Sequence, residues 1–165
     1  PAGTVSLSTS TPTVTYGDNT TVSGVVSNLL TSEPVTLTSQ PYGKGTQSLA
    51  STTTQTNGVF SFGVSPTIQT AYQAHWRKAN SPSVTVTVRP RVGFGRSGRL
   101  FIAKVTSDLT YAGRYVWVQR KAPLGSFRHV NGNYLGANCT AGFCANLWQG
   151  HSSPRVLLHV PPDWC

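Results

Sequence analysis

The sequence predicts an all-β protein made of two tandem β-sandwich domains. Ser, Thr, Val and Gly dominate its 165 residues, whereas charged residues make up only 10%, and Thr and Val fit the half-buried surface of a sheet. Apolar residues recur at every second position over many short runs, which is the period of a strand with one buried face. Turn-forming residues separate these runs at short intervals, as is typical of a sandwich.

Six strands are expected in the first half of the chain, at 4–8, 20–26, 34–40, 59–64, 70–76 and 83–88. The clearest is 59–64, where Phe60, Phe62 and Val64 fall on one face. Residues that supply a positive φ, a fixed φ or a turn-closing side chain lie between the strands, at 16–19, 41–43, 57–58 and 80–82.

A domain boundary is expected after Val88, where Pro90 follows the alternating run. Proline has no N–H to donate to a ladder, and it restricts the residue before it. This boundary divides the chain into domains 1–88 and 89–165, joined by a short linker. Strands of the second domain are expected at 99–105, 114–120, 126–130, 140–147 and 154–160. The 3.6-residue period of a helix never persists beyond about one turn.

A family resemblance covers roughly residues 4 to 147. The stretches TVTYGDNTTVSGVVS, EPVTLTSQPYG and SPSVTVTVRPRV, with GRYVWVQRK further on, resemble the tandem immunoglobulin-like repeats of secreted and surface proteins in actinobacteria and related soil bacteria. The resemblance implies two tandem immunoglobulin-like β-sandwich domains, an extracellular or cell-surface location, and no activity of the module's own. Such repeats typically close with a Gly-Tyr-rich strand, whereas this sequence ends RVLLHVPPDWC, so the resemblance does not extend to the last strand.

The positive charge is concentrated in the second domain. Three basic and two acidic residues precede Arg89, for a net +1, whereas ten basic and two acidic residues lie from Arg89 onward, for a net +8. Guanidinium groups suit phosphate, sulfate and carboxylate, so an anionic partner is one hypothesis and a merely soluble face is the other. The candidate binding residues are Arg89, Arg91, Arg96, Arg99, Arg114, Arg120, Lys121 and Arg128.

Four tryptophans divide into two groups by context. Trp76 and Trp117 stand within expected strands, and we expect them to pack into the two cores. Trp148 and Trp164 stand in loop-like contexts and are the better candidates for an aromatic sugar-binding platform. None of the common nucleic-acid-binding signatures occurs, so nucleic acid is not expected as a specific partner.

No catalytic, cofactor or metal site is expected. The four carboxylates, Asp18, Glu33, Asp108 and Asp163, are shared between the two domains, whereas glycoside hydrolysis needs two carboxylates facing one bond. His75 is expected to be a packed or half-exposed sheet residue. A zinc site that combines the cysteines with His151 and His159 is disfavoured, since the two histidines are too widely spaced.

The three cysteines are Cys139, Cys144 and Cys165. In an oxidising compartment we expect Cys139 to form a disulfide with one partner. Cys144 is the obvious choice, which leaves Cys165 free. Alternatively, Cys165 bonds to one of the first two cysteines or to another molecule.

The function expected from these features is that of a non-enzymatic extracellular structural or interaction module. The chain has no apolar run of about 18 residues that would span a membrane. It starts at Pro1 without a leader, which we interpret as removal of an export signal. The module would be secreted or attached to the cell surface, and its partner would be a second copy or another surface protein. The alternative is a binding module for an anionic polysaccharide or cell-wall polymer through the basic second domain.

Overall fold

The structure is a computed structural model that describes residues 3–97, 100–121, 127–137, 140–144 and 154–158. Within these ranges the elements are β-strands and one 3-10 turn at Thr56–Gly58, so the expected all-β class is confirmed. The chain divides into two compact units, Pro1–Arg89 and Pro90–Cys165. The boundary expected from the sequence falls one residue before this division.

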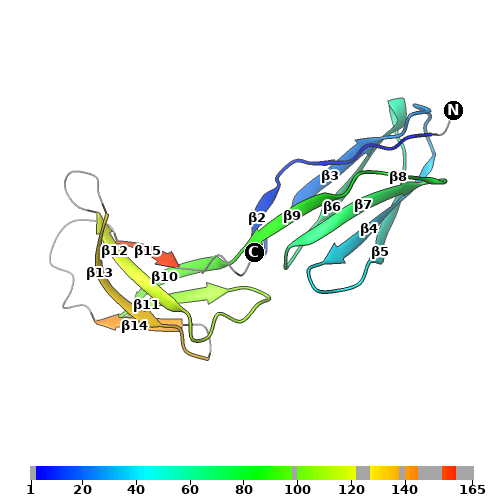
Figure 1. Ribbon diagram of the computed structural model, residues 1–165. Coiled ribbons are helices and arrows are strands. Elements are labelled where there is room, and N and C mark those ends of the chain that lie inside the picture. Colours follow the sequence, from blue (N-terminus) through cyan, green and yellow to red (C-terminus); the bar gives the residue numbers. More distant parts are fainter. Residues whose placement is uncertain (1–2, 98–99, 122–126, 138–139, 145–153, 159–165) are drawn as a thin grey trace. The chain divides into compact units, whose positions relative to one another are not determined.

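Unit 1 is a sandwich of two sheets (Figure 1). The first sheet has the order β1-β3-β6, with the bounds Ser8–Thr9, Thr20–Val25 and Val59–Val64. The second sheet has the order β2-β9-β7-β4-β5, with the bounds Thr13–Thr15, Val84–Arg89, Thr70–Trp76, Pro34–Pro41 and Gln47–Thr53. A short strand, β8 (Ala79–Asn80), also pairs with β7.

The strand order of unit 1 is that of an immunoglobulin-like sandwich. Its first sheet corresponds to strands A, B and E, and its second places F and G beside C. The other strand pairs are antiparallel, whereas β2 runs parallel to β9, with Thr13 opposite Thr87 and Thr15 opposite Arg89. This parallel pair joins the beginning of the unit to its last strand.

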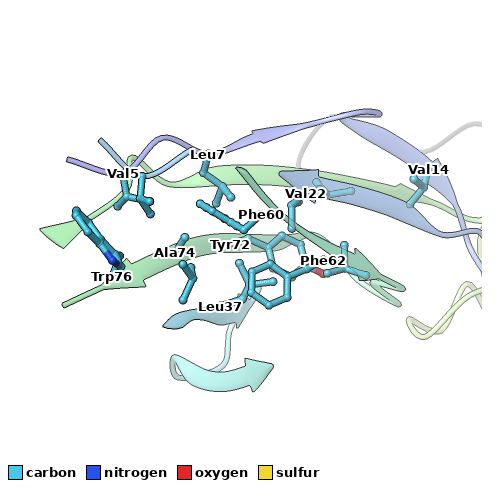
Figure 2. Close-up of a cluster of buried hydrophobic side chains, with 14 residues drawn as sticks. Val5, Leu7, Val14, Val22, Leu37, Phe60, Phe62, Tyr72, Ala74 and Trp76 are labelled. Carbon is cyan, nitrogen blue, oxygen red and sulfur yellow. The ribbon is translucent and has the colours of Figure 1, made fainter. Parts of the chain in front are cut away.

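The core of unit 1 lies between these two sheets (Figure 2). Alternate residues of each strand point inward, and Val22, Leu37 and Phe60 are at most 1% exposed. The face expected from the alternation at 59–64 is confirmed, because Phe60, Phe62 and Val64 are all buried. Trp76 closes one end of this core and is only 3% exposed, as expected from its place in a strand.

Unit 2 repeats the arrangement. One sheet has the order β10-β11-β14, with the bounds Arg91–Ser97, Leu100–Thr106 and Thr140–Cys144. The other has the order β13-β12-β15, with the bounds Phe127–Tyr134, Tyr115–Lys121 and Pro154–Leu158. These six strands have the same order along the chain, and occupy the same places in their two sheets, as the following strands of unit 1: β1, β3, β4, β5, β6 and β7. The units are therefore two copies of one sandwich plan.

Four strands were not expected from the sequence, and one of them, the two-residue β8, overlaps the turn expected at 80–82. Strand β2 has only three residues, and β5 has small polar residues on both faces, so neither shows a clear apolar alternation. The correction with most consequence concerns β10, because residues 91–97 were expected to belong to a linker. The segment instead pairs with β11 along its whole length. Only Pro90 separates β9 from β10.

Candidate functional site

An exposed aromatic cluster lies on the outer face of unit 2, where β12 pairs with β13. Tyr115 stands directly opposite Tyr134, and Trp117 stands two residues further along β12. The ring centroids of Tyr115 and Trp117 are 4.8 Å apart at an interplanar angle of 66°, and those of Tyr115 and Tyr134 are 4.8 Å apart at 80°. Both contacts are edge-to-face, which is a favourable arrangement of aromatic quadrupoles. We call Tyr115, Trp117 and Tyr134 the aromatic face.

The exposure of Trp117 corrects an expectation. We expected this tryptophan to pack into the core, but it is 36% exposed, whereas its neighbour Val116 is fully buried. The run from Tyr115 to Val118 is apolar on both sides of the strand, so its period alone does not say which side faces inward. The structure turns Val116 inward and leaves the aromatic side chains on the outer surface, where Tyr134 is 64% exposed.

Gly132 permits this arrangement. It is the residue of β13 opposite Trp117, and a Cβ atom built on it would lie 2.2 Å from Cε1 and 2.5 Å from Oη of Tyr115. The tyrosine ring therefore lies across the strand on bare glycine backbone. Any larger residue at position 132 would push the ring away, so Gly132 determines the position of the central ring of the aromatic face.

The predicted cationic residues are spread over both units. Arg89 ends β9, whereas Arg91 begins β10, and both are exposed. Arg114 is half-buried and directly precedes β12. The backbone register pairs Arg120 with Arg128. The side chains of Arg96, Arg120, Lys121 and Arg128 and the whole of Arg99 lie outside the described part of the structure. Their role in binding an anion stays a prediction.

Several other predicted residues also lie outside the described residues. They include both tryptophans of the expected platform, Trp148 and Trp164, and the cysteines Cys139 and Cys165. The backbone of Cys144 ends β14, opposite Leu100. The disulfide pairing therefore stays a prediction.

At one end of unit 1, Glu33 binds two neighbouring side chains. Its carboxylate accepts a hydrogen bond of 2.9 Å from Nε1 of Trp76 and two from Arg77, of 3.1 Å from Nε and 2.8 Å from Nη2. The guanidinium carbon of Arg77 also lies 5.0 Å from the ring centroid of Trp76, a cation–π contact. The hydrogen bond from Trp76 is the main cause that lowers the pKa of Glu33 below its ordinary value of 4.5, and Arg77 adds to it against the opposing effect of desolvation.

The loop that carries Glu33 is held in a strained shape. Leu29 has a φ of 55° and Ser32 a φ of 61°, a left-handed conformation that is costly for side chains other than glycine. The buried Thr54 stabilises this loop, because its Oγ1 accepts a hydrogen bond from the Glu33 N–H and donates one to the Leu30 carbonyl. Leu29 and Leu30 remain more than half exposed.

The arrangement around Glu33 is a structural one. The carboxylate already binds three N–H groups, and the shallow hollow beside it is lined by Gly3, Thr4, Ser27, Asn28 and residues 76–79. His75 directly precedes Trp76 in β7. Its Nε2 is 3.0 Å from Thr38 Oγ1, and its Nδ1 is 2.6 Å from Asn80 Oδ1. This partly exposed sheet histidine matches the sequence expectation.

Comparisons with known proteins identify no family for this chain. No protein-family model matches the sequence, and no curated protein matches it. Among solved structures, the chain is similar to a tetra-tandem repeat in the extending region of a large adhesion protein, with a TM-score of 0.44 and 16% sequence identity. The match covers 86% of this chain and 40% of that one. Among the helices of the described residues, none is long and apolar enough to cross a membrane.

Proposed function

We propose that the protein is a non-enzymatic structural module that acts outside the cell and bears mechanical load through its two sandwich units. The observation that supports this proposal most is the parallel pairing of β2 with β9 in unit 1. Strand β2 belongs to the segment that enters the unit, and β9 leads at Arg89 directly to Pro90 and β10. Tension applied to the two ends of unit 1 therefore passes through β1, which pairs with β3, and then through β2 and β9.

Parallel strands that are pulled from opposite ends slide past each other instead of opening one pair at a time. Hydrogen bonds at both ends of the pair resist such sliding, from Tyr16 N to the Arg89 carbonyl (2.8 Å) and from Thr87 N to the Pro12 carbonyl (2.9 Å). Because these bonds are loaded together, they must break together before the core is exposed. The buried Val14 adds the packing of a core side chain to the same strand.

Single-molecule pulling of the full chain from its two ends tests this proposal. The change Tyr16→Pro removes the N–H that binds the Arg89 carbonyl, and we expect it to lower the unfolding force of unit 1 clearly. The control is Thr54→Val, which weakens the loop near Glu33 but leaves β2 and β9 intact, and its effect on the force should be smaller. An unfolding force that is the same in Tyr16→Pro and in the unchanged protein would contradict a load-bearing role for this strand pair.

Self-association through β5 is a second candidate, and a different observation favours it. Strand β5 pairs only with β4 among the described strands, its seven residues carry no charge, and six of the seven are exposed. An open edge of this kind is able to extend a sheet into a second copy, although a register shift at Leu37/Thr38 shortens its regular part. Light scattering with and without reductant distinguishes the two roles, because a 17.6 kDa particle at high concentration would exclude stable self-association.

A further inference from the structure

The aromatic face of unit 2 exposes apolar side chains to solvent, although the stability of the fold does not require this. Trp117 and Tyr134 are 36% and 64% exposed, and Tyr115 holds the two rings together from the centre. The core on the other side of β12 is already filled by the fully buried Val116, and Leu135, the residue after β13, is 2% exposed. Clustered exposed aromatic surface of this kind marks interaction sites more often than it serves stability.

The three rings are fixed before any ligand arrives. Each outer ring contacts Tyr115 edge-to-face at 4.8 Å, and Tyr115 itself lies on Gly132. All three side chains project from paired strands instead of a loop. When a ligand binds here, the protein side chains therefore lose little conformational entropy.

The rings offer single exposed faces and no slot between parallel rings. A base that inserts between two rings needs a parallel slot about twice the stacking distance wide, whereas these rings touch edge-to-face at 4.8 Å. The C–H groups of a sugar ring pack on a single exposed aromatic face, and tyrosine hydroxyls and the indole N–H hydrogen-bond to sugar hydroxyls. The centroids of Trp117 and Tyr134 are at most about 10 Å apart, since each is 4.8 Å from that of Tyr115. This span fits about two sugar units.

The charge of the same unit indicates the kind of polysaccharide. From Arg89 onward ten basic residues stand against two acidic ones, so the local field attracts anions and repels cations. Arg114 directly precedes Tyr115, whereas the exposed Arg91 and Lys104 lie on β10 and β11 in the other sheet of the unit and contribute only to its overall charge. We propose that the aromatic face binds a single acidic polysaccharide chain, with sugar rings on Trp117 and Tyr134 and with carboxylate or sulfate groups attracted by the net positive charge of the unit.

This activity is additional to bearing load and does not depend on it. It would attach the module to an extracellular or cell-wall polymer, while the pairing of β2 with β9 concerns unit 1 alone. The two proposals therefore fail separately. A protein that binds the polysaccharide but unfolds at low force would retain the inference made here and lose the load-bearing role.

Isothermal titration of the full chain with hexagalacturonate tests the proposal, and maltohexaose serves as the neutral probe. We expect Trp117→Ala and Tyr134→Ala each to weaken binding of hexagalacturonate about tenfold or more, the usual range for loss of one stacking ring. The matched control is Tyr42→Ala, because Tyr42 is a tyrosine of unit 1 with 65% exposure, against 64% for Tyr134, and binding should be unchanged. Trp117→Phe should retain most of the affinity because it keeps a ring.

Gly132→Ala provides a test that leaves every aromatic residue in place. The added Cβ displaces the ring of Tyr115, so affinity should fall even though every aromatic and every charged residue is kept. Circular dichroism confirms that each variant is folded before its affinity is compared.

Three results would overturn the proposal. The first is binding that disappears with salt and does not depend on Trp117 or Tyr134, which indicates non-specific attraction to a cationic surface. The second is tighter binding of a twelve-residue oligothymidylate that the same alanine changes abolish, which indicates a nucleic-acid surface. The third is no binding of hexagalacturonate or of a heparin hexasaccharide by the folded protein.

Discussion

Gly24 offers the sharpest test of how unit 1 is packed. It lies in β3 opposite Phe60, and a Cβ atom built on it would lie 1.9 Å from the carbonyl oxygen of Ser6 and 2.7 Å from the ring of Phe60. Neither neighbour has room to move, because the first is backbone and the second is only 1% exposed. The change Gly24→Ala must therefore separate the segment around Ser6 from β3.

The size of the effect follows from the contacts that are lost. Ser6 and Val25 share two hydrogen bonds of 3.0 Å, from Ser6 N to the Val25 carbonyl and from Val25 N to Ser6 Oγ, each worth about 1 kcal/mol net. Overpacking against Phe60 adds roughly 1–3 kcal/mol, and the lower entropy of unfolded alanine offsets less than about 1 kcal/mol. We expect a net loss of about 2–4 kcal/mol, which for a unit of this size lowers Tm by at least about 8 °C.

Gly63→Ala is the matched control. Gly63 lies in β6 of the same sheet, is exposed, and has nothing within 4 Å of its Cβ position. Stability should be unchanged or higher by up to about 1 kcal/mol. Calorimetry of the full chain measures both variants, and pulsed hydrogen exchange assigns the transition to peptides of unit 1. Equal Tm values for the two variants would refute the close approach of Ser6 to Gly24.

Two further predictions concern the loop end of unit 1. The lowered pKa of Glu33 means that its ionised form favours the folded state above the unfolded pKa, and this contribution is lost as pH falls through the folded pKa. Acid titration of unfolding should therefore show a loss of stability below pH 4.5 that is reduced in Glu33→Gln, and identical acid profiles would contradict the contact with Trp76. The change Thr54→Val leaves the Glu33 N–H and the Leu30 carbonyl without their partner, so urea denaturation should show a loss of about 1–3 kcal/mol. The same change at the exposed Thr53 should stay within about 0.5 kcal/mol, and equal effects at the two positions would argue against a stabilising role for Thr54.

The predicted cationic residues and the aromatic face differ in how far the sequence could predict them. The basic residues were visible because charge is a property of composition, but their grouping depends on register, as the pairing of Arg120 with Arg128 illustrates. The aromatic face was not predicted. Tyr115, Trp117 and Tyr134 are separated by up to nineteen positions in the sequence, and only the pairing of β12 with β13 brings them together.

The missed strands have a common physical reason. A strand is recognised by apolar alternation only if one of its faces is buried, and six of the seven residues of β5 are exposed. Strand β10 alternates Val92 and Phe94 with Gly93 and Gly95, and glycine weakens the strand signal because it has no side chain to pack. Long-range hydrogen bonds to β4 and β11 form both strands despite this weak local signal.

The sequence by itself determined the all-β class, the core face of the strands with clean alternation, and the concentration of charge after Val88. These properties depend on local period and composition, which any part of the chain carries alone. The tertiary structure decided which side of Tyr115–Val118 faces inward, how Thr54 supports Glu33, and that β2 runs parallel to β9. Each of these depends on a partner distant in sequence, and no local pattern encodes the register with which two distant strands pair.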